Sequence, residues 1–115
     1  KNRVERYVMA DFDHQSIQDV DLVTGACFMI RKALFEKVGG FDPRYFLFME
    51  DADLCRKIWE AGSRVVYFPQ ARALHYHKRL SSGNVLSLLR QKVFWIHMAS
   101  AAKYFWKWRG KTLPR

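Results

Sequence analysis

Residues 40–54 decide how the chain is interpreted, and they read Gly-Phe-Asp-Pro-Arg-Tyr-Phe-Leu-Phe-Met-Glu-Asp-Ala-Asp-Leu. An aromatic run ends in the carboxylates Glu50, Asp51 and Asp53, and a helical pattern begins at the same place. Acidic groups at a helix start are favoured by the helix dipole and by unpaired N–H groups, so capping is one explanation. The other explanation is that one carboxylate is a general base at the mouth of a pocket walled by the aromatic residues.

The sequence on both sides of this stretch predicts helices and strands in alternation. Helices are expected over residues 31–38 and 51–61, and each is followed by glycine in a position typical of a left-handed C-cap. Strands are expected over residues 20–30, 64–68 and 71–76, the first two of which are rich in β-branched and aromatic side chains. The pattern therefore predicts an α/β fold.

Two further segments could carry chemistry. The small pair Gly25-Ala26 interrupts the first expected strand, which fits either a bulge or the close approach of another backbone or a ligand. His75 lies near the expected end of a strand and is followed by His77 and by the basic, serine-containing residues 78–82. Imidazole binds divalent metals, and Lys, Arg and Ser pair with phosphate oxygens, so this segment could hold a metal–diphosphate.

The composition limits the class of protein. The chain has 115 residues, 50% of them hydrophobic, which suffices for one packed domain or part of one. Its net charge is +9, from 20 Lys and Arg against 11 Asp and Glu, and no carboxylate side chain follows Glu60. An anionic partner such as phosphate groups, acidic lipid or nucleic acid is therefore expected for the C-terminal half. Cys27 and Cys55 lie in apolar patterns, and we expect both to be reduced core residues.

One long helix is predicted from residue 85 to residue 108. Aromatic residues crowd its second half: Trp95, Tyr104, Phe105, Trp106 and Trp108. They are too many for one buried face, and exposed Trp and Tyr beside Lys and Arg are typical of a helix that lies on a membrane surface. Packing against another part of the protein is the alternative, and the sequence leaves both open.

Several motifs occur together in a characteristic order. They are Gly25-Ala26-Cys27, Ile30-Arg31-Lys32, Val38-Gly39-Gly40-Phe41-Asp42, Phe46-Leu47-Phe48, Glu50-Asp51-x-Asp53-Leu54-Cys55-x-Lys57, Ala61-Gly62, Val65-Val66-Tyr67-Phe68-Pro69 and His75-Tyr76-His77. This set resembles the C-terminal half of family 2 glycosyltransferases, the inverting enzymes of GT-A fold. Within that family it is most similar to bacterial rhamnosyltransferases that build cell-wall and surface polysaccharides. The resemblance covers residues 18–82 and, less sharply, the helix that follows.

The resemblance implies a partial GT-A-type, Rossmann-like α/β fold. It would comprise a short mixed sheet with packed helices and a long C-terminal amphipathic helix. Residues 1–82 would bind the acceptor and carry the catalytic base, and residues 83–115 would form the basic aromatic C-terminal helix.

By the same resemblance, the site residues fall at these positions: catalytic Asp51 and Glu50, acceptor-binding Gly25, Ala26 and Asp53, diphosphate-binding Arg79 and Ser81, and the metal ligand His75. Asp51 would accept the proton of an acceptor hydroxyl as its oxygen attacks the anomeric carbon, and a single displacement would invert that carbon. Asp11-Phe12-Asp13 has the D-x-D form but falls in a variable segment of the family, so we expect no metal there.

The cofactors and partners are also implied by the resemblance. A divalent metal, Mn²⁺ or Mg²⁺, is expected in the full enzyme. The donor would be a nucleotide sugar, with rhamnose as the candidate, and the acceptor a glycan or lipid-linked precursor. Residues 85–111 would lie on the inner face of the bacterial cytoplasmic membrane, and no nucleic-acid partner is expected.

Other interpretations stay open. The family's D-x-D motif and its nucleotide-binding half are not found in the chain, so we expect the chain by itself to be inactive. One alternative is a non-catalytic basic α/β module that binds acidic membrane or nucleic acid through residues 78–111. Another is a metal-binding protein that uses His75, His77 and Asp residues.

Overall fold

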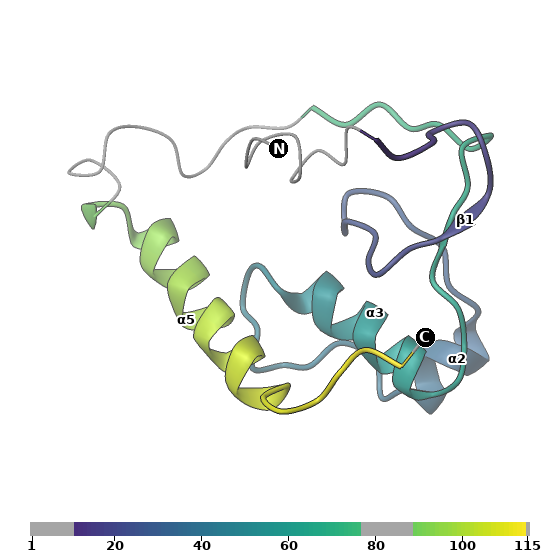
Figure 1. Cartoon of the computed structure of the whole chain (residues 1–115). Helices are drawn as coiled ribbons and strands as arrows, with labels where there is room; N and C mark the ends of the chain where they lie inside the picture. Colours follow the sequence, from purple (N-terminus) through teal and green to yellow (C-terminus); the bar gives the residue numbers. More distant parts are fainter. Residues whose placement is uncertain (1–10, 77–88, 115) are drawn as a thin grey trace.

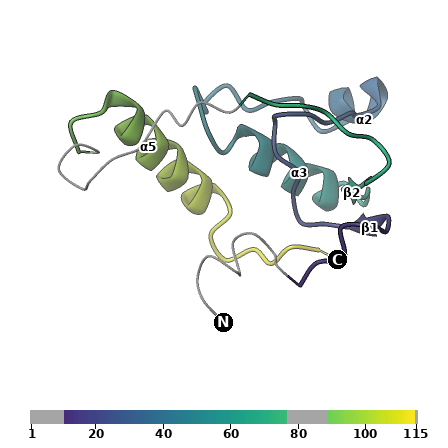
Figure 2. The same ribbon diagram turned by 90° about the horizontal axis from the view of Figure 1, so that it is seen from above.

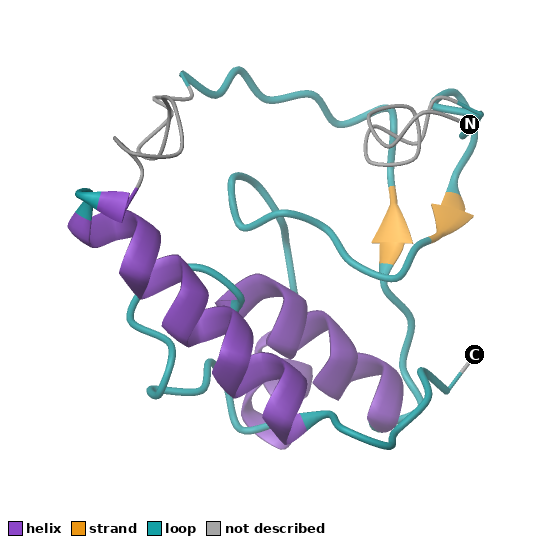
Figure 3. Ribbon diagram, turned by 60° about the vertical axis from the view of Figure 1, so that its left-hand side comes forward, coloured by secondary structure: helices purple, strands orange, loops and turns teal. Residues whose placement is uncertain are grey.

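The computed structural model of the protein describes residues 11–76 and 89–114. In chain order its elements are β1 (Gln18–Asp19), α2 (Lys32–Lys37), α3 (Glu50–Glu60), β2 (Val66–Tyr67) and α5 (Lys92–Lys107). Figures 1 and 2 show α3 between α5 on one side and the strands on the other. The helices gather at one side of the molecule and the strand pair lies at the other (Figure 3).

The helix α3 is the centre of the fold. Its buried face carries Leu54, Cys55, Ile58 and Trp59, which recur at helical spacing and join Val20 and Val65 in the hydrophobic core. The Trp59 indole N–H also donates to the carbonyl oxygen of Val20 at 3.2 Å. The helix ends as predicted, because Gly62 adopts a φ of +71° and the next N–H bonds back to the Ile58 carbonyl at 3.1 Å.

The sheet is smaller than the sequence predicts. β1 and β2 pair antiparallel, with Gln18 opposite Tyr67 and Asp19 opposite Val66. Residues 20–30 and 71–76, which we expected to be strands, form none, and the described residues contain one antiparallel pair instead of a mixed sheet. β-prone side chains do not make a strand without a neighbour to accept and donate its backbone hydrogen bonds. In the described part of the chain only β2 supplies such a neighbour.

The helix α5 confirms the predicted C-terminal helix only from Lys92 onward. The prediction of one unbroken helix is wrong at residues 90–91, because Gln91 has an extended backbone with ψ of 121°, and residues 85–88 lie outside the described residues. The helix contacts the loop before α3 through Ser100, whose residue is 2% exposed, and α3 itself through Lys107. After Trp108, which is 8% exposed, the chain turns back and Leu113 packs against the core. None of the described helices has the length and apolar character needed to cross a bilayer.

The two cysteines differ in environment. Cys55 is buried as expected, and burial raises the pKa of its thiol. Cys27 is exposed, so the prediction that it belongs to the core is wrong. The segment that carries it forms no strand and therefore does not bury alternate side chains. Both thiols are free.

Candidate active site

The carboxylate of Asp51 lies against the backbone of Gly25. Its Oδ2 accepts a hydrogen bond from the Gly25 N–H at 2.8 Å, across 26 residues of sequence. Its Oδ1 accepts one from the N–H of Ala52 at 2.8 Å. A Cβ placed on Gly25 would lie 3.6 Å from both the Cβ and Oδ2 of Asp51. The fold thus brings together the glycine motif and the acidic motif that the sequence singled out.

A left-handed turn delivers the acidic motif to the start of α3. Phe48 and Met49 have φ values of +67° and +68°, which is unusual for two consecutive residues with side chains. Each such residue costs on the order of 1–3 kcal/mol and persists only where its surroundings enforce it. The turn lets α3 begin at Glu50, whose Oε2 is buried without a hydrogen-bond partner among the described residues.

The inward face of α5 holds this turn in place. The Ser100 hydroxyl donates to the carbonyl oxygen of Leu47 at 2.7 Å, and the His97 ring stacks on Phe48 with centroids 4.4 Å apart. Lys103 donates through Nζ to the Arg44 carbonyl oxygen at 2.8 Å. These contacts come from successive turns of one helix, so α5 fixes the loop that presents Glu50 and Asp51.

The carboxylate of Asp53 is buried and accepts hydrogen bonds from other side chains of the protein. Its residue is 1% exposed, and its Oδ2 accepts from Lys107 Nζ at 2.8 Å. Its Oδ1 accepts from the Trp108 indole N–H at 2.8 Å and from the Tyr45 hydroxyl at 3.4 Å. Burial, with the nearby charge of Asp53, raises the pKa of Tyr45 to about 12, so this hydroxyl stays a donor. That Asp53 binds the acceptor substrate stays a prediction. Its hydrogen bonds with Lys107 and Trp108 tie α3 to the end of α5.

Asp42 extends the same network to the surface. Its Oδ2 lies 2.6 Å from Arg44 Nη2 and 2.8 Å from Lys107 Nζ. Hydrogen bonds from Arg44, and then from Lys107, hold the pKa of the Asp42 carboxyl well below its usual range. Lys107 therefore joins two carboxylates that stand 11 positions apart in the chain, Asp42 and Asp53.

Acid should weaken the fold through Asp42. A carboxyl with a lowered folded-state pKa stabilises the protein above its unfolded pKa of about 3.9, and this stabilisation is lost as the pH falls further, toward the folded pKa. We expect urea unfolding midpoints to fall between pH 5 and pH 3, and to fall less in Asp42→Asn. Glu36→Gln, at an exposed position of α2, is the matched control. Equal acid losses in the wild type and Asp42→Asn would contradict this expectation.

The remaining predicted site residues are placed as follows. Ala26 is exposed beside Gly25, and His75 is exposed in an irregular segment after β2. Arg79 and Ser81 lie outside the described residues, so their predicted diphosphate contacts are not tested. Within residues 11–76 and 89–114, no three His, Cys, Asp or Glu side chains gather closely enough to hold a metal ion. His75 therefore makes no complete metal site with the described residues, and its role as a ligand stays a prediction.

Comparison with known proteins decides the family. The family model described as "Glycosyltransferase like family 2" matches residues 4–96. The chain belongs to this family. Its GT-A fold is of the α/β class, which agrees with the helices and the small sheet seen here. Family 2 glycosyltransferases commonly use a divalent metal.

Several curated relatives are similar to half or more of this family 2 chain. The N-acetylglucosaminyl-diphospho-decaprenol L-rhamnosyltransferase of Mycobacterium tuberculosis is 46% identical over 68 residues, which are 59% of this chain and 22% of that protein. The rhamnosyltransferase WbbL of Escherichia coli is 42% identical over 57 residues, 50% of this chain and 22% of that protein. The O-antigen biosynthesis protein RfbC of Myxococcus xanthus is 31% identical over 78 residues, 68% of this chain and 6% of that protein.

The chain matches only part of the length of these relatives. The matched region spans 22% of the first two relatives, so the chain corresponds to only a part of such proteins. No solved structure matches the chain.

Sequence reasoning missed the residues that hold the acidic motif from α5. His97, Ser100 and Lys107 contact the loop before α3 or α3 itself. Ser100 gave a weak signal, because a small polar residue stood on an otherwise apolar helical stripe. Lys107 gave none, because a lysine among aromatic residues is equally typical of a membrane surface.

Proposed function

We propose that this chain supplies the catalytic base and the acceptor side of an inverting glycosyltransferase. The transferred sugar would come from a nucleoside diphosphate donor, with rhamnose as the candidate because of the relatives' names. The acceptor would be a hydroxyl of a cell-wall or surface polysaccharide precursor, glycan or lipid-linked. Residues 1–82 would form the part around the base, and residues 83–115 the basic aromatic C-terminal part that contains α5.

The contact between Asp51 and Gly25 carries this proposal. A general base must have a free lone pair within reach of the proton it takes. Each oxygen of Asp51 accepts one backbone N–H, and a carboxylate oxygen has a second lone pair for an acceptor hydroxyl. The two backbone N–H groups fix the orientation of the carboxylate, which is half-buried rather than enclosed. Gly25 leaves the space beside the carboxylate that an acceptor would need.

The chemistry assigned to Asp51 is a single proton transfer. Its carboxylate would take the proton of the acceptor hydroxyl as the oxygen bonds to the anomeric carbon. The bond from that carbon to the diphosphate breaks at the same time, and the nucleoside diphosphate leaves as an anion. Glu50, at the same helix start, adds a second carboxylate near the reaction site.

The enzyme would work at the inner face of the cytoplasmic membrane. One M. tuberculosis relative is named for a decaprenol-linked diphosphate, a substrate class whose lipid part requires a bilayer. Residues 85–111 contain many Lys, Arg and Trp side chains, which are typical of segments at anionic membrane surfaces. We therefore place the protein there as a peripheral enzyme.

Gly25→Ala should impair acceptor use without unfolding the protein. The added Cβ would sit at ordinary van der Waals distance from Asp51, 3.6 Å, so the fold should accept it. It would fill the space in which the acceptor hydroxyl approaches, and we expect KM for the acceptor to rise about tenfold, equivalent to about 1.4 kcal/mol. Steady-state kinetics in the enzyme that contains this chain would measure it.

Two comparisons make this test specific. Gly62→Ala should cost stability rather than acceptor affinity, because Gly62 has a φ of +71° and no neighbour within 4 Å. A Gly25→Ala enzyme with an unchanged KM for the acceptor would show that the acceptor does not pass beside Gly25.

A further inference from the structure

The outward face of α5 is apolar, although nothing in the described structure covers it. Trp95, Met98, Phe105 and Trp106 are 57%, 49%, 68% and 76% exposed, respectively. Ala99 and Ala102, also exposed, lie between them. Helical spacing places these side chains on two adjoining stripes. One stripe contains Trp95, Ala102 and Trp106, and the other contains Met98, Ala102 and Phe105. We call these six residues the α5 outer face.

The helix differs from an ordinary surface helix in what its outward face carries. Ser100 and Lys107 point inward and bond to the Leu47 carbonyl and to Asp53, and Val93 and Ile96 are half-buried, but large apolar side chains also face outward. A surface helix normally turns its apolar stripe to the core and its polar residues to water. Contiguous exposed apolar surface of this kind marks an interaction site.

Within residues 89–114, all charged side chains that flank the α5 outer face are positive. Residues 89–114 contain the basic residues Arg90, Lys92, Lys103, Lys107, Arg109 and Lys111, and no Asp or Glu. Of these, Lys107 is neutralised by Asp42 and Asp53, and the rest are exposed. The cores of protein–protein interfaces are depleted in lysine, whereas anionic headgroups attract it.

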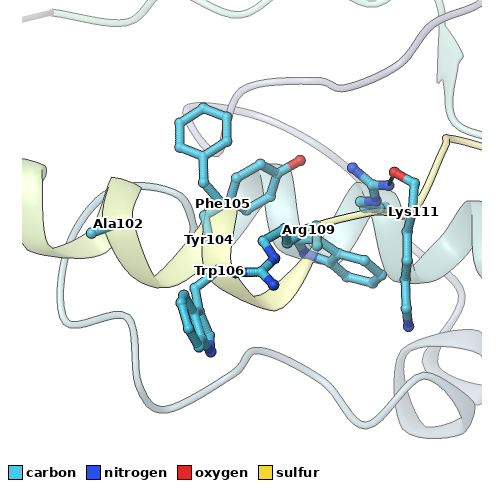
Figure 4. Close-up of a pocket in the computed structure, with 8 residues that line it drawn as sticks. Ala102, Tyr104, Phe105, Trp106, Arg109 and Lys111 are labelled. Carbon is cyan, nitrogen blue, oxygen red and sulfur yellow. Dashed lines mark hydrogen bonds between the residues drawn. The ribbon is translucent and has the colours of Figure 1, made fainter.

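The C-terminal end of α5 shows how aromatic and basic groups combine. Figure 4 shows Phe105 and Trp106 projecting to either side of the helix, with Arg109 nearby. The Arg109 guanidinium lies 5.1 Å from the centre of a Trp106 ring, and Lys111 Nζ lies 5.4 Å from that of Trp108. These residues line an open hollow of about 610 Å³ at the surface. Trp and cations side by side suit the region where acyl chains meet headgroups.

We propose that the α5 outer face docks on a bilayer of anionic lipid, with the indoles of Trp95 and Trp106 inserted and Lys92 and Arg109 at the headgroups. The proposal deepens the proposed function, because it names the surface on which the acceptor would be met. Since the inward face of α5 holds the turn before Asp51, the base would stand about one helix diameter, roughly 10 Å, above that surface.

Vesicle sedimentation tests the docking without any transferase activity. Wild-type protein should bind vesicles of phosphatidylglycerol and phosphatidylcholine and bind pure phosphatidylcholine far less. Trp95→Ser with Trp106→Ser should lower the partition coefficient at least about tenfold, because each residue loses buried apolar area. Phe68→Ser, which removes an aromatic side chain 52% exposed next to β2, is the matched control and should bind normally.

The charges and the depth of insertion provide independent readouts. Lys92→Glu with Arg109→Glu should weaken binding to the anionic vesicles by on the order of 10²-fold or more, since each basic residue contributes. Lys32→Glu with Lys37→Glu on α2 makes the same change in net charge and should have little effect. Brominated acyl chains should quench tryptophan fluorescence in the wild type, and Trp95→Phe with Trp106→Phe should keep binding but lose the quenching.

Three outcomes would overturn the docking proposal. The first is that the protein does not bind the anionic vesicles. The second is that the Trp95→Ser/Trp106→Ser variant binds them as well as the wild type does. The third is that the wild type forms a stable dimer in sedimentation and this variant does not. The last would assign the α5 outer face to a second copy of the chain. Each leaves the proposed role of Asp51 untouched, because that role is tested by turnover.

Discussion

Asp51→Asn should lower sugar transfer by about 10²–10⁴-fold in the enzyme that contains this chain, the usual contribution of a general base. Asparagine has almost the same shape, and its one side-chain oxygen can still accept the N–H of Gly25, while the hydrogen bond from the Ala52 N–H is lost, so the helix start should survive with a small loss of stability. It cannot accept the proton of the acceptor hydroxyl. We expect kcat to fall while KM for the donor changes little, as measured by release of nucleoside diphosphate.

Matched controls separate a lost base from a damaged fold. Glu60→Gln removes an exposed carboxylate from the other end of α3 and should leave turnover and stability unchanged. The thermal midpoint of Asp51→Asn should lie within a few degrees of the wild type. Near-normal turnover in Asp51→Asn would remove it as the base. If Glu50→Gln then abolished turnover, the base would be Glu50.

Asp53→Ala should destabilise the fold by about 2–4 kcal/mol, somewhat less than the loss of one partner from a fully buried ion pair. The change leaves the Trp108 indole N–H without its acceptor, and among the described residues it leaves Lys107 with Asp42 as its one carboxylate partner. The contact between α3 and α5 weakens as a result. Urea unfolding should show the midpoint lowered by about 1–2 M, at a typical slope for a small domain.

The milder change Asp53→Asn keeps an acceptor for the indole and should lose less, which guards against a variant that fails to fold. Glu60→Ala is the control on the exposed side of the same helix. A double-mutant cycle with Lys107→Met should give a coupling energy within about 0.5–3 kcal/mol, as expected for residues in contact. A negligible loss of stability in Asp53→Ala would show that its carboxylate does not hold α5 to α3, and would favour the predicted acceptor contact instead.

Much of the local structure was predictable from the sequence. The helices α2 and α3, their glycine stops and the apolar face of α3 all follow from helical periodicity and from the backbone freedom of glycine. The strands were over-predicted at residues 20–30 and 71–76. A strand depends on a partner that may stand far away in sequence, and β-propensity cannot supply that information.

The candidate site was predictable only as a set of motifs. Resemblance to the family selected both Gly25 and Asp51, but no local pattern states that the N–H of one bonds to the carboxylate of the other. The burial of Asp53 was equally hidden, because an acidic residue at a helix start is usually solvated or a cap. Its partners Lys107 and Trp108 come from the other end of the chain.

The sequence by itself determined where α2 and α3 begin and end, which family motifs the chain carries and where its charge lies. Those properties depend on neighbouring residues and on composition. The tertiary structure alone decided that Asp51 rests on Gly25, that α5 holds the left-handed turn at Phe48 and Met49, and that α5 turns its aromatic face outward. Each of these depends on packing between segments far apart in the chain, which fixes the face of a helix that is buried and the strain that a turn can bear.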